Sequence, residues 1–252
     1  MQTKFITTQD YLNQSSITLL LNLLIILITT LNRLDPPILT YEFFSRDTNV
    51  VAKKLIGTKL VKTIRNNNRK ITLSGIIVET EAYGYKSDEA SHAYRGMTTR
   101  NMVMFGPVGR TYIYFTYGNH YCFNVIAKSK NQIAGAVLIR GVEPKEGIEY
   151  MKDYRNLDDI MLLTNGPGKI TQAFGIDKQY NNQDLTNINN DLYIVKGFIP
   201  NLVLATKRIG IKKSIHVYKR YILASKIENK IFINQFVSKK KENNHFHICR
   251  LL

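Results

Sequence analysis

Hydrophobic and polar positions alternate along the middle of the chain in short runs that predict strands, and turn residues separate these runs. The period of two predicts a strand over residues 58–64, and Asn66-Asn67-Asn68 predicts a turn into a partner strand over residues 71–80. Similar runs predict later strands at residues 111–117, 121–127, 135–142, 191–195 and 202–205. Residues 84–107 lack this period and predict a long loop.

Helical signals separate some of these strands. Asp47 predicts the N-cap of a helix that ends before Gly57. Pro144 and Glu146 suit the first turn of a second helix, which is predicted to run into the mid-150s. A third helix is predicted over residues 169–174. Strands and helices interleaved in this way predict one mixed domain.

The two ends of the chain differ from this central region. Residues 17–31 are mostly Leu and Ile, but the run is shorter than the ~20 residues of a membrane-spanning helix. The segment lacks the basic start and small-residue cleavage site of a secretory signal, so we expect an extra helix or a loosely attached extension. Residues from Lys239 on are basic and polar, which favours a frayed tail. The prediction is therefore an extension (1–36), a domain (37–238) and a tail (239–252).

The charge balance indicates the kind of partner. The chain has 35 basic and 19 acidic residues, a formal net charge of +16. Such an excess attracts polyanions and favours a nucleic acid, because the many aromatic side chains offer surfaces on which bases can stack. The cysteines, Cys122 and Cys249, form no CxxC motif, so neither a zinc site nor a disulfide framework is indicated. We expect a reducing compartment, the cytoplasm near the nucleoid.

Two carboxylates at the end of an apolar strand are the first candidates for chemistry. Glu79 and Glu81 are two residues apart, so in an extended strand they share a face. Burial and mutual repulsion could raise the proton affinity of one of them and make it a general base. Two readings without catalysis remain open, namely a pair of solvated acids or an ion pair with Arg140, which ends another apolar strand.

The aromatic residues give a second signal. Tyr83, Tyr114 and Tyr117 stand at strand ends beside loops, where binding residues tend to lie, whereas Tyr112 suits packing. His92 lies in a loop without a companion His or Cys, so we expect no metal site. Aromatic surfaces beside a candidate general base suit chemistry on a nucleic-acid base.

At this point the residues resemble a known family, the 3-methyladenine DNA glycosylases of the alkyladenine type. The resemblance rests on a collinear series of blocks: Asp47–Gly57, Ile77–Tyr83, Asp88–His92, Thr99–Asn101, Met104–Pro107, Tyr112–Gly118, Asn124, Val137–Arg140, Glu143–Pro144, Asn165–Lys169 and Arg208–Gly210. Departures from the family pattern are Gly84-Tyr85, Asn119, Gly141 and a divergent C-terminal part. None of them touches a residue assigned to chemistry.

The resemblance implies a fold and an activity. The fold is α+β, a single mixed domain with a curved, mostly antiparallel sheet flanked by helices. The activity is that of a monofunctional DNA glycosylase, which flips an alkylated or deaminated purine out of duplex DNA and hydrolyses its N-glycosyl bond. The enzyme is expected to act as a monomer and to need neither a cofactor nor a metal.

The resemblance also assigns roles to residues. Tyr83 and His92 would face one side of the flipped purine and Tyr114 the other, and Asn124 would line the pocket floor. Tyr117 would wedge into the duplex and fill the vacated space.

Catalysis is assigned to Glu81 as the general base that activates water, with Arg140 orienting the carboxylate or the water. Contacts with the DNA backbone are expected from basic residues along the chain: Arg95, Arg100, Lys169, Lys207 and Arg208.

Two other functions would use the same features. One is a non-enzymatic, basic and aromatic platform for nucleic acid, which would bind lesion DNA without turnover. The other is a bifunctional glycosylase/lyase, in which a lysine forms a Schiff base with the sugar and the strand is cut without alkali.

Overall fold

The computed structural model describes residues 18–23, 36–67, 69–116, 118–227, 230–237 and 247–249. Backbone contacts divide the chain after Pro37. In the first part, residues 18–23 are helical, and residues 1–17 and 24–35 of the predicted extension lie outside the described residues. Among the helices of the described ranges, none combines the length and the apolar character that crossing a membrane requires.

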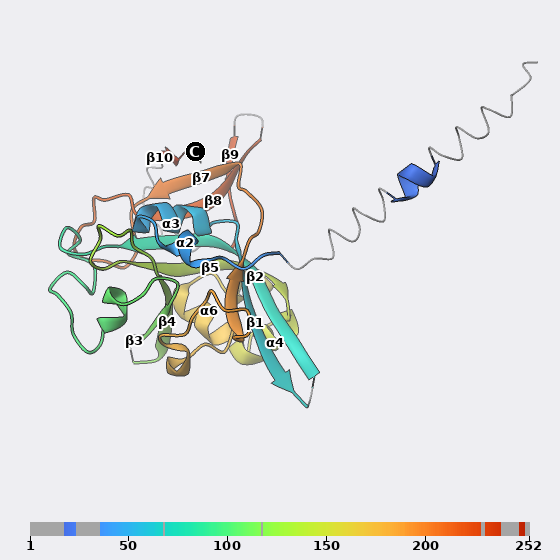
Figure 1. The fold of residues 1–252 in the computed structure, drawn as a ribbon, viewed down its shortest axis with the longest axis horizontal. Coiled ribbons are helices and arrows are strands. Elements are labelled where there is room, and N and C mark those ends of the chain that lie inside the picture. Colours follow the sequence, from blue (N-terminus) through green and yellow to red (C-terminus); the bar gives the residue numbers. More distant parts are fainter. Residues whose placement is uncertain are drawn as a thin grey trace, which may run out of the picture. The chain divides into compact units, whose positions relative to one another are not determined.

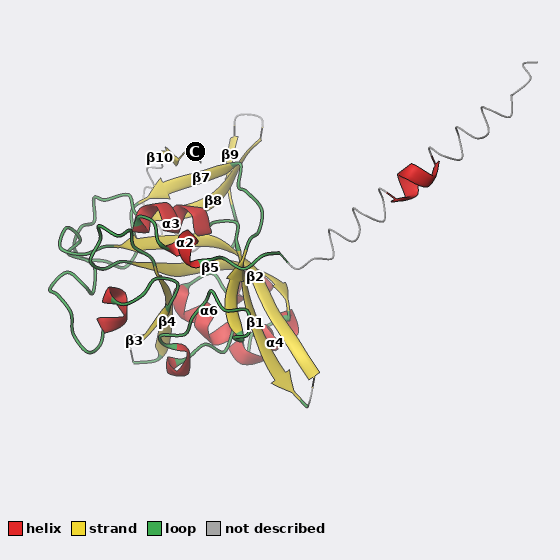
Figure 2. Ribbon diagram, viewed as in Figure 1, coloured by secondary structure: helices red, strands yellow, loops and turns green. Residues whose placement is uncertain are grey.

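One antiparallel sheet forms the centre of the second part (Figures 1 and 2). Its described strands are β1 (Lys59–Asn66), β2 (Arg69–Tyr83), β3 (Thr111–Thr116), β4 (His120–Ile126), β5 (Ala136–Glu146), β6 (Leu192–Val195), β7 (Leu202–Thr206), β8 (Arg220–Ile227), β9 (Lys230–Ile233) and β10 (His247–Cys249). The sheet runs in the order β10-β7-β8-β2-β5-β4-β3, β1 pairs with β2 and β6, and β9 pairs with β8. The α+β prediction is therefore confirmed.

The central strand, β2, organises this sheet because other strands cover both of its edges. Its first half forms a hairpin with β1, as the alternating pattern predicts. On the opposite edge it pairs with β5 from Ser74 to Tyr83, and β8 joins the first edge at residues 79–81. Consequently β2 is buried over its second half and exposed at its start.

Helices cover the sheet. They are α2 (Tyr41–Phe44), α3 (Thr48–Leu55), α4 (Ile148–Arg155), α5 (Ile160–Leu163) and α6 (Pro167–Ala173), with the short 3-10 turns η1 (Met102–Phe105) and η2 (Lys178–Tyr180). The Asp47 carboxylate accepts hydrogen bonds from the amides of Asn49 and Val50, which confirms the predicted N-cap of α3. α3 packs on β2 and β5, and α6 packs on β4 and β5 (Figure 1).

The predicted start of the second helix is wrong. Pro144 and Glu146 belong to β5, and the helix α4 starts at Ile148 after Gly147, whose φ is +71°. The strand tolerates the proline because Pro144 lies where the β2–β5 register shifts, and the Glu146 carboxylate accepts a hydrogen bond of 2.7 Å from the Ser74 hydroxyl.

Two helices and three strands were not predicted from the sequence: α2, α5, β8, β9 and β10. The strand β8 matters most, because its apolar run Tyr221-Ile222-Leu223-Ala224 is buried and pairs with β7. β10 falls in the predicted tail and pairs with β7. The remainder of that tail lies outside the described residues.

Candidate active site

The site begins at an irregularity in the pairing of β2 with β5. Between Ile77 and Thr80 the register shifts twice, and the Cα register passes over Val78 on β2 and Arg140 on β5. Such β-bulges turn side chains away from their regular alternation and are common beside active sites. Here the bulge brings the Arg140 guanidinium to the carboxylates of β2.

Glu79 lies at the centre of a buried ionic cluster. Its Oε1 accepts hydrogen bonds from Arg140 Nε at 3.0 Å and from Arg220 Nε at 2.6 Å. All three residues are buried. Of the alternatives left open, the ion pair with Arg140 is present at Glu79, and Arg220 is a partner that the sequence did not reveal.

Glu81 is equally buried, but neutral donors make most of its contacts. Its Oε1 accepts a hydrogen bond of 2.8 Å from the Ile209 amide and lies 3.4 Å from Arg140 Nε. Its Oε2 accepts a hydrogen bond of 2.7 Å from the Tyr83 hydroxyl. Glu81 has 0% exposure, so its side chain has no direct contact with bulk solvent. The reading of Glu79 and Glu81 as solvated acids is therefore wrong.

These contacts set the protonation of Arg140 and Tyr83. Burial by itself would lower the pKa of Arg140, but the charges of Glu81 and Glu79 outweigh it and raise this pKa, so the guanidinium stays charged. Burial, together with the Glu81 charge, raises the pKa of Tyr83 well above its ordinary value. Tyr83 therefore donates its proton in the hydrogen bond to Glu81.

A cavity of about 550 Å³ adjoins this cluster. That size is typical of sites for small ligands. Aromatic, polar and small apolar side chains line it, among them Tyr83, His92, Met104, Tyr112, Tyr114, Cys122, Asn124, Ala136, Leu138, Arg140 and Ile209. The structure thus brings five of the predicted site residues to one cavity: Tyr83, His92, Tyr114, Asn124 and Arg140.

The aromatic walls are arranged differently from the expectation. The rings of His92 and Tyr114 have centroids 4.6 Å apart with an interplanar angle of 66°, so they touch and leave no room for a base between them. The contact between these rings argues against the expected placement of His92 beside Tyr83, opposite Tyr114. His92 and Tyr114 form one wall, and Tyr83 lines the cavity as a separate residue.

Hydrogen bonding fixes the first wall. His92 Nδ1 and the Tyr112 hydroxyl are hydrogen-bonded at 2.9 Å. Partial desolvation and the nearby Arg100 charge lower the pKa of His92, so its ring is neutral at neutral pH and can stack without carrying a charge. Burial raises the pKa of Tyr112 to about 12, which keeps its hydroxyl protonated.

Asn124 forms part of the cavity from β4. Its Nδ2 donates hydrogen bonds to the carbonyls of Tyr112 at 3.0 Å and Cys122 at 3.4 Å. The side chain is buried. Because the backbone of two strands holds this amide, it presents a fixed polar group to the cavity.

The predicted DNA-backbone residues fall into two classes. Arg95, Arg100 and Lys207 are exposed, and Lys169 is half-buried and donates to Asn165 Oδ1 at 2.6 Å. Arg208 is different, because its side chain is fully buried and ion-paired, so its placement argues against a phosphate contact. Tyr117, the predicted wedge, lies outside the described residues.

Several residues at the site were missed from the sequence. The Ile209 amide and Arg220 hold the carboxylates, and Lys212 and Lys213 line the cavity from an exposed loop. The basic pair Lys212-Lys213 after Gly210 is a signal that could have identified the loop. The Ile209 amide could not be identified in this way, because almost every residue carries a backbone N–H group.

Within the ranges that the structure describes, no cluster of His, Cys, Asp and Glu side chains is placed to hold a metal ion. The charged residues of the site instead satisfy one another through ion pairs.

Comparison with known proteins gives a consistent result. The sequence model described as Methylpurine-DNA glycosylase (MPG) matches residues 42–227. A protein of Carboxydothermus hydrogenoformans named "Putative 3-methyladenine DNA glycosylase" is 43% identical over 205 residues, which cover 81% of this chain and 100% of the relative. A protein of the same name from Chlorobium phaeobacteroides is 44% identical over 188 residues, or 74% of this chain and 94% of the relative.

Proposed function

The chain belongs to the methylpurine-DNA glycosylase family, and from that premise we infer that it is a 3-methyladenine DNA glycosylase. Such an enzyme hydrolyses the N-glycosyl bond of an alkylated purine and starts base excision repair of the damaged DNA. The observation that supports this activity at the site is a cavity with aromatic walls beside the buried side chains of Glu81 and Arg140.

We propose that the flipped purine lies between Tyr83 and the wall formed by His92 and Tyr114. All three line the cavity, and the contact between the His92 and Tyr114 rings favours this arrangement over one in which His92 lies beside Tyr83. Flat side chains on both faces offset part of the unstacking free energy, a few kcal/mol, that flipping requires. Alkylated purines carry a positive charge and are attracted to electron-rich rings.

Asn124 is proposed to select among purines. Its amide is held by two backbone carbonyls, so it cannot move aside to admit a larger base. A base that carries an exocyclic amine at this position, such as normal guanine, would clash sterically with this fixed side chain. Excision of a normal base would be disfavoured for this reason.

Glu81 is proposed as the general base. It would take a proton from water as the water oxygen attacks C1′ of the sugar and the purine leaves with the electrons of the broken bond. The Tyr83 hydroxyl donates to Glu81 Oε2, and this oxygen keeps a further lone pair that could accept a hydrogen bond from the attacking water. Arg140, 3.4 Å from Glu81 Oε1, would orient the carboxylate during the step.

DNA binding is proposed to involve the turn between β3 and β4 and the basic residues around the cavity. Tyr117 would enter the duplex from this turn, where Gly118 has a φ of +73°. Phosphates would be held by exposed or half-buried basic side chains: Arg95, Arg100, Lys169, Lys207, Lys212 and Lys213. We further propose that the enzyme acts as a monomer, in the cytoplasm on nucleoid DNA.

The reaction is proposed to be monofunctional, with water as the nucleophile. Lys212 and Lys213 lie at the cavity, so a lysine nucleophile is the alternative to test. Borohydride treatment in the presence of lesion DNA should trap no protein–DNA adduct. A trapped adduct would place the enzyme in the bifunctional class.

The proposed function is tested with duplex oligonucleotides that carry a single alkylated or deaminated purine. After incubation with the protein, hot alkali should cut the strand at the lesion, and without alkali the strand should stay intact. Binding of these duplexes without any alkali-labile site would support the non-enzymatic platform instead.

A further inference from the structure

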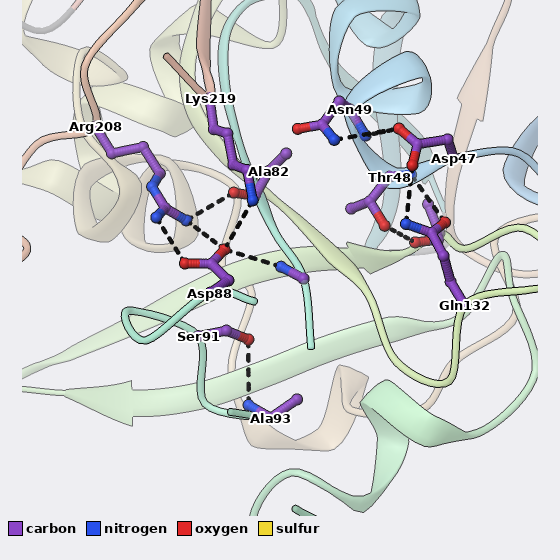
Figure 3. A network of polar contacts seen from close by, with 12 residues as sticks. Asp47, Thr48, Asn49, Ala82, Asp88, Ser91, Ala93, Gln132, Arg208 and Lys219 are labelled. Carbon is purple, nitrogen blue, oxygen red and sulfur yellow. Dashed lines mark hydrogen bonds and ion pairs between the residues drawn. The ribbon is translucent and has the colours of Figure 1, made fainter. Parts of the chain in front are cut away.

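A buried arginine–aspartate pair lies directly behind the active site. Arg208 follows β7, and its Nη1 and Nη2 donate hydrogen bonds to Asp88 Oδ2 at 2.8 Å and Asp88 Oδ1 at 2.7 Å. Nη1 also donates to the Ala82 carbonyl at 2.9 Å (Figure 3). Both side chains of the pair have 0% exposure, so the contact is a bidentate ion pair shielded from water.

Asp88 is held from more than one direction. Its Oδ2 accepts a hydrogen bond of 3.0 Å from the Gly84 amide and lies 3.5 Å from Lys219 Nζ (Figure 3). Burial by itself would raise the pKa of Asp88, but the hydrogen bonds from Arg208 and Gly84 outweigh it and lower this pKa. The carboxylate therefore remains ionised and joins the loop after β2 to the segment before β8.

The Arg208 guanidinium supports the ring of Tyr83. Its Cζ lies 4.6 Å from the centroid of the Tyr83 ring. Tyr83 lines the cavity while the Arg208 side chain is fully buried, so the guanidinium packs against the ring from the protein interior. The hydrogen bond to the Ala82 carbonyl fixes the backbone one residue before Tyr83.

Two residues next to Arg208 donate hydrogen bonds to Glu81, the proposed general base. Ile209 donates its amide to Glu81 Oε1 at 2.8 Å, and Tyr83 donates its hydroxyl to Glu81 Oε2 at 2.7 Å. Each oxygen of the Glu81 carboxylate thus accepts a hydrogen bond from a residue next to Arg208. Ile209 follows Arg208 in the chain, and the Tyr83 ring packs against its guanidinium. A shift of Arg208 would move the stacking ring and both donors together.

From this geometry we propose that the Asp88–Arg208 pair is a positioning device for catalysis. It fixes the ring of Tyr83 against which the flipped purine stacks, and it sets the orientation of the Glu81 carboxylate through the Ile209 amide and the Tyr83 hydroxyl. Neither member of the pair touches the substrate. The inference rests on the proposed function and adds two residues to it.

The alternative is that the pair stabilises only the fold. Buried ion pairs are weak contributors to stability, and a purely structural pair would change the melting temperature without changing the rate of the folded enzyme. A positioning pair changes the rate at temperatures where the variant is fully folded. The two roles therefore separate in single-turnover kinetics below the melting transition.

The experiment compares Arg208→Met, Asp88→Asn and the double variant with the unaltered protein. Single-turnover excision is measured with enzyme in excess over a duplex that contains one hypoxanthine. Misplacing catalytic groups by about 1 Å lowers rates by about 100-fold, so each single variant should lose about that factor. Because the two residues act as a unit, the double variant should lose about the same factor and not its square.

A second readout follows stacking without requiring excision. Ethenoadenine in a duplex fluoresces, and its emission changes when the base stacks against an aromatic ring. Arg208→Met should weaken this change on binding, because Tyr83 is no longer held. Arg208→Lys keeps the charge but not the planar fork, so we expect it to restore only part of the rate and of the emission change.

The matched control is Arg110→Met, which removes a partly exposed arginine–aspartate pair with 3.7 Å between Arg110 Nη2 and Asp184 Oδ2. It should leave the excision rate and the emission change as in the unaltered protein. All variants are first shown to be folded by thermal melting and circular dichroism.

Two outcomes would overturn the positioning role. One is a folded Arg208→Met protein with the unaltered rate and emission change, and the other is a double variant whose loss is the product of the single losses. Failure of the proposed function looks different, because the unaltered protein would then excise no lesion. Even in that case the emission of bound ethenoadenine still tests whether Arg208 positions Tyr83.

Discussion

The two halves of β2 place charged residues in different environments, one exposed to solvent and one buried. At its start, Arg69 and Lys70 are exposed and pair across the sheet with β1 alone. Near its end, Glu79 and Glu81 have 0% exposure, where β5 and β8 flank the strand on both edges. One strand thus combines a solvated hairpin with a buried ionic cluster.

The difference shows what keeps charge inside this protein. An isolated buried carboxylate is unfavourable by several kcal/mol, so it needs charged partners with good geometry. The exposed half of β2 needs none, whereas the buried half receives Arg140 from β5 and Arg220 from β8. Elements distant in the sequence therefore supply the charged partners that let Glu79 be buried.

The largest expected effect comes from breaking the buried cluster at Glu79. Glu79→Gln leaves Arg140 and Arg220 without the carboxylate that they share, and removing one partner of a buried pair costs about 3–5 kcal/mol of unfolding free energy. Urea denaturation measures this loss.

Lys70→Gln in the exposed half is the control for Glu79→Gln. It should change the unfolding free energy by less than about 0.5 kcal/mol. Equal losses in the two variants would mean that burial does not distinguish the halves of β2.

Acid should weaken the loop after β2, where Asp88 pairs with Arg208. The pKa of Asp88 lies below its ordinary value of 3.8, so its contribution to stability is complete above that pH and is lost as the pH falls through the folded-state value. Thermal melts from about pH 6 to about pH 2 should show a falling midpoint, with a shallower fall in Asp88→Asn. Identical profiles for the two proteins would exclude Asp88 as a contributor.

A smaller effect is expected from Tyr83→Phe. The ring that stacks on the base is kept, and only the hydrogen bond to Glu81 Oε2 is lost. A hydrogen bond to a charged group contributes about 1.5–3 kcal/mol, but water can replace this donor, so we expect about a tenfold slower single-turnover excision. A loss as large as that of a Glu81 variant would assign the hydroxyl a direct part in proton transfer.

The smallest effect concerns phosphate contacts near the cavity. Lys212→Gln should lower the slope of log affinity against log salt by about one, because one phosphate contact is lost. Lys70→Gln, at the far half of β2, should leave the slope unchanged. The measurement is duplex binding at several salt concentrations, and equal slopes for all three proteins would remove Lys212 from the interface.

Local patterns predicted much of the fold because they encode local structure. The hairpin of β1 and β2 follows from alternation and the asparagine turn, and the N-cap of α3 follows from Asp47. The start of α4 was misplaced because Pro144 also suits a bulged strand. The position of β8 depends on pairing with β2 across more than a hundred residues, which no local pattern specifies.

The site was predictable in its residue types and less so in its contacts. Glu81 and Arg140 come together as expected, although Arg140 lies in the middle of β5 and not at the end of a strand. Arg208 stands in a basic turn, and such a turn usually faces solvent. Its partner Asp88 is 120 residues away, so only the folded chain reveals that the guanidinium is buried.

The central claim is that Glu81 in the buried half of β2 is the general base, and Glu81→Gln tests it most directly. The substitution keeps the shape of the side chain and removes its ability to accept a proton from water. Single-turnover excision from a lesion duplex should fall by about 10²–10⁴-fold while the protein stays folded and still binds the duplex. A folded Glu81→Gln protein that excises the lesion at the unaltered rate would contradict the claim.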